Sequence, residues 1–286
     1  IAVREAHNRG LELEAWINPY RISNSSDIQS IQQESIAYEI ITSDENDERI
    51  IKTENCLYYN PSYTDIQSYI LCCIREILLN YNVDGIHIDD YFYPTTDKKI
   101  DEEIYAEYIS QGGKLSLEDF RRININSLVS SIYFIVKNYN KDLVFTISPA
   151  ADIEKNYNNL YADVVLWASE NGYADYIIPQ LYYGYYNENM PFEESLDEWT
   201  GLESKYCKII PGLSLYKCGK EDVFAGKGKN EWIENKKIIY QQMNSCIEYG
   251  TSGIAFYSAS VLYNNSEDIY FNKITDIVNN WNSAET

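Results

Sequence analysis

The stretch YNVDGIHIDDYFYP, residues 81–94, decides the fold class of this chain. Its centre is a short apolar run, and two neighbouring acids, Asp89 and Asp90, follow that run directly. A buried strand that ends in acidic residues is typical of parallel α/β proteins, which collect their functional groups at the carboxyl ends of the strands. Side chains alternate along a strand, so His87, Asp89 and Tyr91 are expected to point one way and Asp90 the other. The pattern favours Asp89 as the inward acid.

Five further runs rich in β-forming residues end in the same way, in polar or aromatic side chains. The predicted strands are 11–17, 85–89, 143–147, 176–181, 207–211 and 252–257. Stretches with helical spacing of apolar residues lie between them. The predicted helices are 66–78, one beginning near Ser116, 192–206, 230–249 and 267–281. Regular alternation of strand and helix predicts an α/β fold with a parallel sheet covered by helices, in a doubly wound or a barrel form.

The number of predicted strands is two short of the eight in a (βα)8 TIM-type barrel, and residues 1–9 resemble the end of a helix. We therefore expect the first two βα units to lie upstream of Ile1, and residues 1–286 to form a single, N-terminally incomplete barrel domain. The insert 23–63 is expected to be an elaborated loop on the active face. An incomplete sheet leaves unpaired edges, so self-association through exposed sheet edges is also expected.

Charge and composition exclude several classes of partner. The 23 basic and 44 acidic residues give a net charge of −21, which disfavours nucleic acid and other polyanions. No run approaches the roughly 18 uncharged apolar residues of a membrane span, so none is expected in this segment. The spacing of the six cysteines matches no zinc signature, and two histidines leave little for a metal site. We expect neither a metal nor a cofactor.

Two long blocks resemble those of a known family. The segments AHNRGLELEAWINPYR at 6–21 and DGIHIDDYFYP at 84–94 resemble signatures of the glycosyl hydrolase-like 10 family. Shorter similar blocks follow at 120–124, 148–149, 161–163, 175–182 and 253–258. The resemblance covers nearly the whole chain and implies a (βα)8 barrel that hydrolyses glycosidic bonds. Family members include bacterial envelope enzymes that cut peptidoglycan glycan lacking stem peptides, which implies a polysaccharide or oligosaccharide substrate and a secreted or envelope-attached location.

Hydrolysis of a glycoside usually needs two carboxyl groups, one to protonate the leaving oxygen and one to attack or to activate water. We assign one of these catalytic roles to Asp89. The second carboxyl is open among four acids near strand ends, namely Asp90, Asp152, Glu14 and Glu170; adjacency favours Asp90. The alternative is a non-catalytic carbohydrate-binding barrel, because Tyr91 stands where a chitinase strand has its acid.

Polar and aromatic residues at the strand ends are expected to bind sugar, because amides and guanidinium groups bond directionally and aromatic faces stack on sugar rings. The predicted substrate-binding residues are Asn18, Tyr20, Arg21, His87, Tyr91, Asp152, Gln180, Tyr182 and Tyr183. Among the tryptophans, Trp16 beside Asn18 is placed for a site. Other charged residues are open to structural roles, as ion pairs, helix caps or loop anchors: Arg121, Arg122, Asp163, Asp175 and His7.

Overall fold

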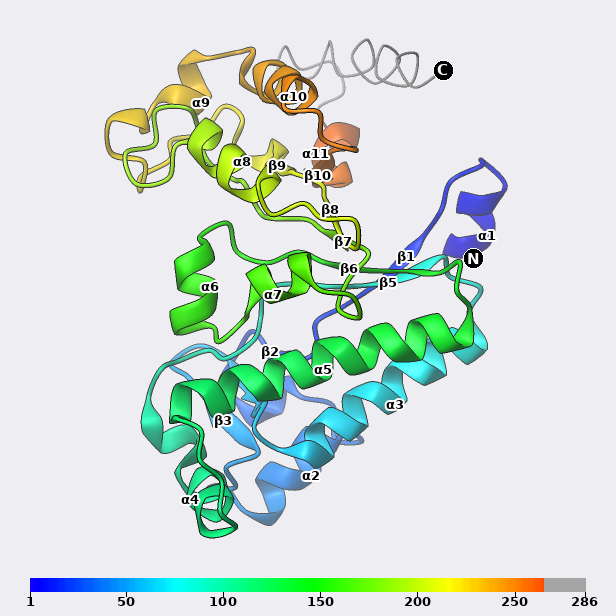
Figure 1. Cartoon of the computed structure of the whole chain (residues 1–286), viewed down its shortest axis with the longest axis vertical. Coiled ribbons are helices and arrows are strands. Elements are labelled where there is room, and N and C mark those ends of the chain that lie inside the picture. Colours follow the sequence, from blue (N-terminus) through cyan, green and yellow to red (C-terminus); the bar gives the residue numbers. More distant parts are fainter. Residues whose placement is uncertain (265–286) are drawn as a thin grey trace. The chain divides into compact units, whose positions relative to one another are not determined.

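The computed structural model describes residues 1–264, which divide into two compact units. The first comprises Ile1–Ile147 and Ile153–Asp175, and the second comprises Ser148–Asp152 and the chain from Tyr176 onward. Figure 1 colours both units along the sequence. The helix expected at 267–281 lies outside the described residues, and the expectation of a single barrel domain stays a prediction.

Three parallel strands form the sheet of the first unit. They are β1 (Glu14–Ile17), β5 (Gly85–Ile88) and β6 (Val144–Ile147), with β5 pairing with β1 on one side and β6 on the other. The side chains of β5 and β6 are mostly apolar and buried, which explains why the sequence pattern identifies these two, whereas those of β1 are half-buried or exposed. The first begins three residues later than expected from the sequence, at Glu14 rather than at residue 11.

The register of this sheet places Trp16, His87 and Thr146 in one row across the three strands. A glycine at the start of β5 makes the close approach possible. A Cβ on Gly85 would lie 2.5 Å from the carbonyl oxygen of Val144 and from its side chain. Any larger residue would force neighbouring strands apart, so Gly85 supports the alignment of the row above it.

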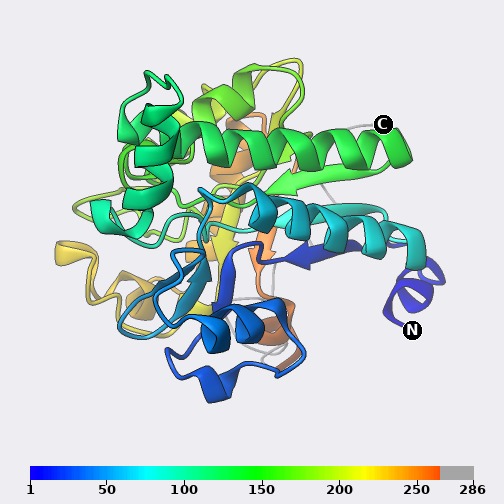
Figure 2. The same cartoon turned by 90° about the horizontal axis from the view of Figure 1, so that it is seen from below.

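Two long helices, α3 (Thr64–Asn80) and α5 (Leu117–Tyr139), lie side by side (Figures 1 and 2). Ser116 caps α5, because its hydroxyl accepts a hydrogen bond from the backbone N–H of Asp119 at 3.1 Å. Their buried faces recur at helical spacing, as in Ile66, Ile70, Ile74 and Leu78 on α3. Both helices therefore follow the pattern that predicts them.

The insert 23–63 and the strand that leads into it form a small antiparallel sheet, in the order β2 (Arg21–Ser23), β4 (Leu57–Tyr59) and β3 (Ile50–Lys52). The sequence predicts only an elaborated loop there, because strands of three residues leave no readable alternation. The remaining elements of the first unit are short: α1 (Ala2–His7), η1 (Ile28–Ser30), α2 (Ile36–Ser43), η2 (Lys98–Asp101), α4 (Glu102–Ser110), α6 (Ile153–Asn159) and α7 (Val164–Ser169).

The second unit contains two parallel strand pairs. These pairs are β7 (Tyr176–Ile177) with β8 (Lys208–Ile209), and β9 (Gly212–Ser214) with β10 (Ala255–Tyr257). Isolated bridges at Gln180 extend the pairing to Ala150 and Gly212. The helices and turns are α8 (Phe192–Thr200), η3 (Leu215–Lys217), η4 (Gly226–Gly228), α9 (Glu231–Glu234), α10 (Ile238–Glu248) and α11 (Ala259–Asn264).

The single helix predicted over 230–249 is wrong, because the chain breaks it at Asn235. This residue ends α9, and its side chain accepts a hydrogen bond from the backbone of Lys237 at 3.1 Å. A side chain that bonds its own backbone competes with helix continuation. The α/β class with parallel strands is confirmed, and none of the helices in residues 1–264 combines the length and apolarity needed to cross a bilayer.

Candidate active site

Asp89 lies directly after β5 and is only 4% exposed. The indole N–H of Trp16 donates to its Oδ2 at 3.2 Å, whereas Oδ1 is buried and has no hydrogen-bond partner within residues 1–264. Burial raises the pKa of Asp89 to about 6; the Trp16 hydrogen bond opposes this shift and the charge of Asp90 adds to it. A buried carboxylate oxygen without a partner costs free energy, and such groups are typical of functional sites.

An open aromatic face lies beside this acid. Trp16 is 57% exposed on β1, which lies at the end of the strand order among the described residues, and its ring meets His87 edge-on with 5.3 Å between centroids. The guanidinium carbon of Arg21 lies 3.5 Å from the ring centroid of Tyr91. Exposed indole rings stack on sugar faces, and a guanidinium fork binds hydroxyls or carboxylates. The surroundings of Asp89 therefore provide groups that suit a glycan.

Two further residues that follow β1 have unsatisfied polar atoms. Asn18 uses its oxygen to accept from the backbone N–H of Arg21 at 2.9 Å, but its Nδ2 is buried without a partner in the described chain. Tyr20 is fully buried, and its hydroxyl also lacks a partner there. Because β1 and β5 are parallel neighbours, these atoms and Asp89 Oδ1 follow the same edge of the sheet.

The four acids considered for the second carboxyl occupy different places. Asp90 is half-buried next to Asp89, and its charge acts on the pKa of Asp89. Glu14, at the start of β1, is occupied by a hydrogen bond from Thr146. Glu170 is exposed at the end of α7, and Asp152 belongs to the second unit. Of these four acids, Asp90 is the one whose negative charge raises the pKa of Asp89.

Three tyrosines form an aromatic cluster in the second unit. Tyr182 and Tyr257 stack with 5.9 Å between centroids, and Tyr216 meets both edge-on at 5.9 and 5.8 Å. The sequence predicts Tyr182 as a binding residue but does not single out Tyr216 or Tyr257. The available signal is positional, because Tyr257 ends β10 and Tyr216 follows β9 by two residues.

Gln180 and Tyr183 lie beside this tyrosine cluster in sequence. The Gln180 side chain donates to the carbonyl oxygen of Ser148 at 3.0 Å, which fastens two strand ends together. Burial, reinforced by the charge of Asp152, raises the pKa of Tyr183. The ammonium of Lys217 lies 5.8 Å from the Tyr183 ring centroid. The Gln180 side chain is therefore engaged in a hydrogen bond within the fold, whereas Tyr183 lies near the charges of Asp152 and Lys217.

The residues expected to be structural have structural partners. Arg121 is fully buried in an ion pair with Asp101, and Asp163 caps α7 by accepting from the backbone of Leu166. Asp175 accepts from the backbone N–H of Phe145. The remaining two, His7 and Arg122, pair with Asp84 and Asp119. Each of these five residues therefore has a contact that explains its presence as part of the fold, without a catalytic role.

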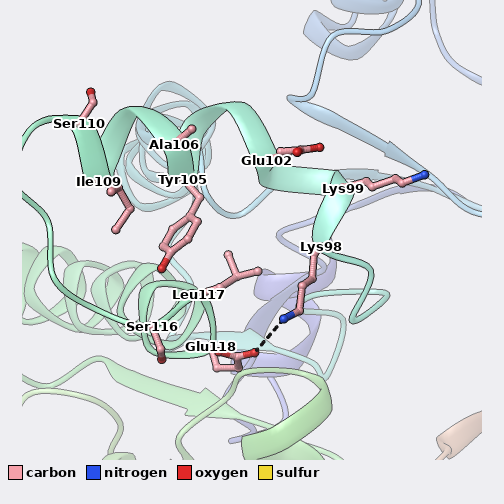
Figure 3. Close-up of a pocket in the computed structure, with 10 residues that line it drawn as sticks. All are labelled: Lys98, Lys99, Glu102, Tyr105, Ala106, Ile109, Ser110, Ser116, Leu117 and Glu118. Atoms are coloured by element: carbon pink, nitrogen blue, oxygen red, sulfur yellow. Dashed lines mark ion pairs between the residues drawn. The ribbon is translucent and has the colours of Figure 1, made fainter.

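A groove of about 860 Å³ lies between α4 and the start of α5 (Figure 3). It shares no lining residue with the surroundings of Asp89. Its walls are apolar at Tyr105 and Leu117, and its charges are exposed, as in the 4.0 Å pair of Lys98 and Glu118. Neither this groove nor any other place in residues 1–264 gathers three His, Cys, Asp or Glu side chains that could hold a metal ion. The chemistry is therefore best assigned to the surroundings of Asp89 rather than to this groove.

Comparison with known proteins identifies relatives in sequence. The family model described as glycosyl hydrolase-like 10 matches residues 2–233. Glycosyl hydrolase YngK of Bacillus subtilis is 30% identical over 234 residues, which are 75% of this chain and 44% of the relative. Glycosyl hydrolase DigH of Escherichia coli K12 is 26% identical over 252 residues, 81% of this chain and 56% of the relative. The chain thus spans about half the length of these curated relatives.

A solved structure is similar in fold. The glycoside hydrolase domain of PgaB (BpsB) from Bordetella bronchiseptica aligns with a TM-score of 0.59 at 13% sequence identity. The alignment covers 91% of this chain and 74% of that domain. At this identity the likeness concerns the fold alone, and the parallel strands and intervening helices are those of a partial TIM-type barrel.

Proposed function

The chain belongs to the glycosyl hydrolase-like 10 family, and from this premise we propose that it hydrolyses O-glycosidic bonds of a polysaccharide with Asp89 as a catalytic carboxylate. The observation that carries the proposal is the state of Asp89. It is a buried acid whose pKa lies at about 6, with one oxygen held by Trp16 and the other without a partner in the described residues. Such a group exchanges its proton near neutral pH, which acid–base catalysis requires.

At pH 7 a group of this pKa is mostly ionised, so Asp89 is suited to attack the anomeric carbon or to activate water. The proton for the leaving oxygen comes from a second carboxyl, and Asp90 is the acid we propose. Its charge already acts on Asp89, and deprotonation of one member of such a pair favours protonation of the other. The exposed ring of Trp16 provides a stacking surface for a sugar beside the pair.

The substrate we propose is peptidoglycan glycan that lacks stem peptides. The family resemblance implies this substrate, and the charge of the chain agrees with it. A net charge of −21 repels the carboxylates of stem peptides and of other acidic wall polymers, whereas a peptide-free strand carries less negative charge. With such a substrate, we also propose that the protein acts outside the cytoplasm, secreted or attached to the envelope.

The test is digestion of three glycans, peptide-free peptidoglycan strands, chitin and an α-glucan, with products read by mass spectrometry. We expect the protein to release fragments from the peptidoglycan strands and the Asp89→Asn variant to be at least about a thousandfold slower. The matched control is Asp163→Asn, because asparagine also caps helix α7 well and should leave turnover unchanged. Equal cleavage by the wild type and Asp89→Asn would exclude the role of Asp89.

A second candidate function is binding of carbohydrate without cleavage. The observation that favours it is aromatic: Trp16 is exposed beside Asp89, and the tyrosine cluster lies at strand ends of the second unit. Stacking surfaces of this kind bind sugar whether or not a second acid is present. No cleavage of any of the three glycans, together with equal binding by the wild type and Asp89→Asn, would favour this alternative.

A further inference from the structure

A chain of hydrogen bonds crosses the three parallel strands of the first unit below Asp89. Nδ1 of His87 on β5 lies 2.7 Å from the hydroxyl oxygen of Thr146 on β6. The same hydroxyl donates to Oε2 of Glu14 on β1. Thr146 is 1% exposed, so water does not compete with either bond. The register of the sheet sets Thr146 beside His87, and Glu14, two residues before Trp16 on β1, completes the chain of hydrogen bonds.

The direction of each bond follows from which partner is able to donate. An ionised carboxylate only accepts, so Thr146 must donate its single proton to Glu14. The Thr146 oxygen is then left to accept, and the donor across the 2.7 Å contact must be the Nδ1–H of His87. One fixed carboxylate on β1 therefore sets, through the Thr146 hydroxyl on β6, the position of a proton on a ring of β5, the strand between them.

Several charges act on Glu14 and set the pH range in which it is ionised and these hydrogen-bond directions hold. Burial is the largest cause that raises its pKa, and the Thr146 hydrogen bond opposes it. The negative charges that also raise the pKa are Glu12, Asp175 and Asp84. Two of these are partly neutralised, Asp84 by His7 and Asp175 by Lys137. The order of donors applies wherever Glu14 is ionised.

His87 is held in its neutral form by the same surroundings. Burial lowers its pKa to about 4, so the ring stays uncharged at neutral pH. A neutral imidazole carries one proton, and with that proton on Nδ1 the other nitrogen is an acceptor. No group in residues 1–264 forms a hydrogen bond with Nε2. His87 also shares the side of β5 with Asp89, and both contact Trp16.

We propose that Glu14 and Thr146 fix His87 as a neutral ring protonated on Nδ1, so that Nε2 is a hydrogen-bond acceptor for a sugar hydroxyl or acetamido N–H bound beside Asp89. His87 is thereby a specificity-determining residue, and Glu14 and Thr146 are positioning residues that act through it. The nature of the donor rests on the proposed function, whereas the protonation state of His87 does not.

The first test needs no substrate. In protein labelled with ¹⁵N-histidine, the spectrum contains signals from two histidines, and a His7→Asn variant identifies those of His87. We expect His87 at pH 7 to carry its proton on Nδ1 and to remain neutral down to about pH 4. A ring protonated on Nε2, or one that titrates near 6.5, would overturn the proposal.

Variants of Thr146 separate positioning from packing. Thr146→Val has nearly the same shape but offers no hydroxyl, so the preference for Nδ1 protonation should be lost. Thr146→Ser keeps the hydroxyl and should retain the preference. Thermal unfolding of both variants identifies any that fails to fold, and Glu14→Leu, which has no oxygen to accept from Thr146, then serves as the second route to the same loss. If Thr146→Val and Glu14→Leu both keep the proton on Nδ1, the chain of hydrogen bonds does not control His87.

The second test concerns the ligand. Binding of peptide-free peptidoglycan strands is measured on the Asp89→Asn variant, with and without His87→Phe, which keeps a ring against Trp16 but has no acceptor. We expect His87→Phe to weaken binding about tenfold, as for loss of one buried hydrogen bond. Unchanged affinity would refute the acceptor role. If Asp89→Asn binds no strand at all, the proposed function fails, while the protonation result stands by itself.

Discussion

Two buried acids of the first unit, Asp101 and Asp89, differ in how completely they are paired. Asp101 is 0% exposed and receives two hydrogen bonds from Arg121, at 2.6 and 2.8 Å, and a third from Ser62 at 3.2 Å. Asp89 is 4% exposed and receives one side-chain bond, from Trp16, while its Oδ1 has no partner among the described residues. The same chemical group is fully satisfied in one place and left open in the other.

The difference separates a structural acid from a functional one. Asp101 joins the insert and the start of helix α5, through Ser62 and Arg121. A carboxylate with a bidentate guanidinium partner and a further hydroxyl donor has no capacity left for a ligand. Asp89 has the opposite properties, because its pKa is raised to about 6 and one oxygen is available. Unsatisfied burial is the physical signature on which the functional assignment depends.

The largest effect on stability is expected when the paired acid loses its partner. Arg121→Met leaves Asp101 buried and unpaired, which should lower the free energy of unfolding by about 3–5 kcal/mol. Arg9→Met is the matched control, because the pair of Arg9 and Glu5 is exposed to solvent and its loss should cost under about 1 kcal/mol. Urea unfolding measures both. Equal losses in the two variants would remove the contrast between the acids.

Replacement of Asp89, the acid with an oxygen left unpaired among the described residues, should instead raise the free energy of unfolding. Because the pKa of Asp89 is about 6 rather than 3.8, its ionised form costs the folded state up to about 3 kcal/mol at high pH. This contribution is absent at low pH, where the group is protonated in both states, and appears as pH rises through 3.8 to about 6. Asp89→Asn should therefore stabilise the protein by about 2–3 kcal/mol at pH 8 and hardly at pH 3.5. Urea unfolding at both pH values tests this, and destabilisation at pH 8 would contradict it.

A smaller effect is expected at the side-chain hydrogen bond from Trp16, which Asp89 has beside a backbone hydrogen bond from Tyr91. In the wild type, the hydrogen bond from the indole N–H of Trp16 lowers the pKa of Asp89. Trp16→Phe keeps an aromatic ring but removes this N–H. The pKa should rise by about one unit, the value of one charge-assisted hydrogen bond. Titration of the side-chain carboxyl by ¹³C NMR measures it, with Asp89→Asn to assign the signal. An unchanged pKa would mean that the indole does not hold the carboxylate.

The smallest effect is expected from the nearest cation. Arg21 also lowers the pKa of Asp89, but through space and after the other causes. Arg21→Leu should raise that pKa by about a few tenths of a unit, and Arg21→Lys should leave it close to the wild-type value. The same ¹³C titration distinguishes them. A shift larger than that of Trp16→Phe would make Arg21, not Trp16, the main partner of the acid.

Much of the first unit is predictable because its strands are apolar and its acids follow them directly. The run before Asp89 predicts strand β5, and side-chain alternation correctly favours Asp89 over Asp90 as the more buried acid. Ser116 and the apolar spacing after it predict α5. In each case the signal lies within a few neighbouring residues, where local geometry decides the outcome.

Features that depend on register between distant segments are not predictable in this way. Thr146 meets His87 because β6 aligns with β5, and no local pattern gives that alignment. The tyrosine cluster likewise needs strand β9, whose three residues after a proline are too few to show a strand pattern. That Asp89 Oδ1 has no hydrogen-bond partner among residues 1–264 is a property of the packed interior, which no sequence pattern predicts.

The most direct test of the account is the rate of cleavage of peptide-free peptidoglycan strands measured against pH. The protein should show a rate that depends on ionisation of a group with a pKa of about 6, and Trp16→Phe should move that dependence to higher pH. Asp89→Asn should abolish the dependence together with the activity. A rate that rises near pH 6 in both the wild type and Asp89→Asn would contradict the assignment of Asp89.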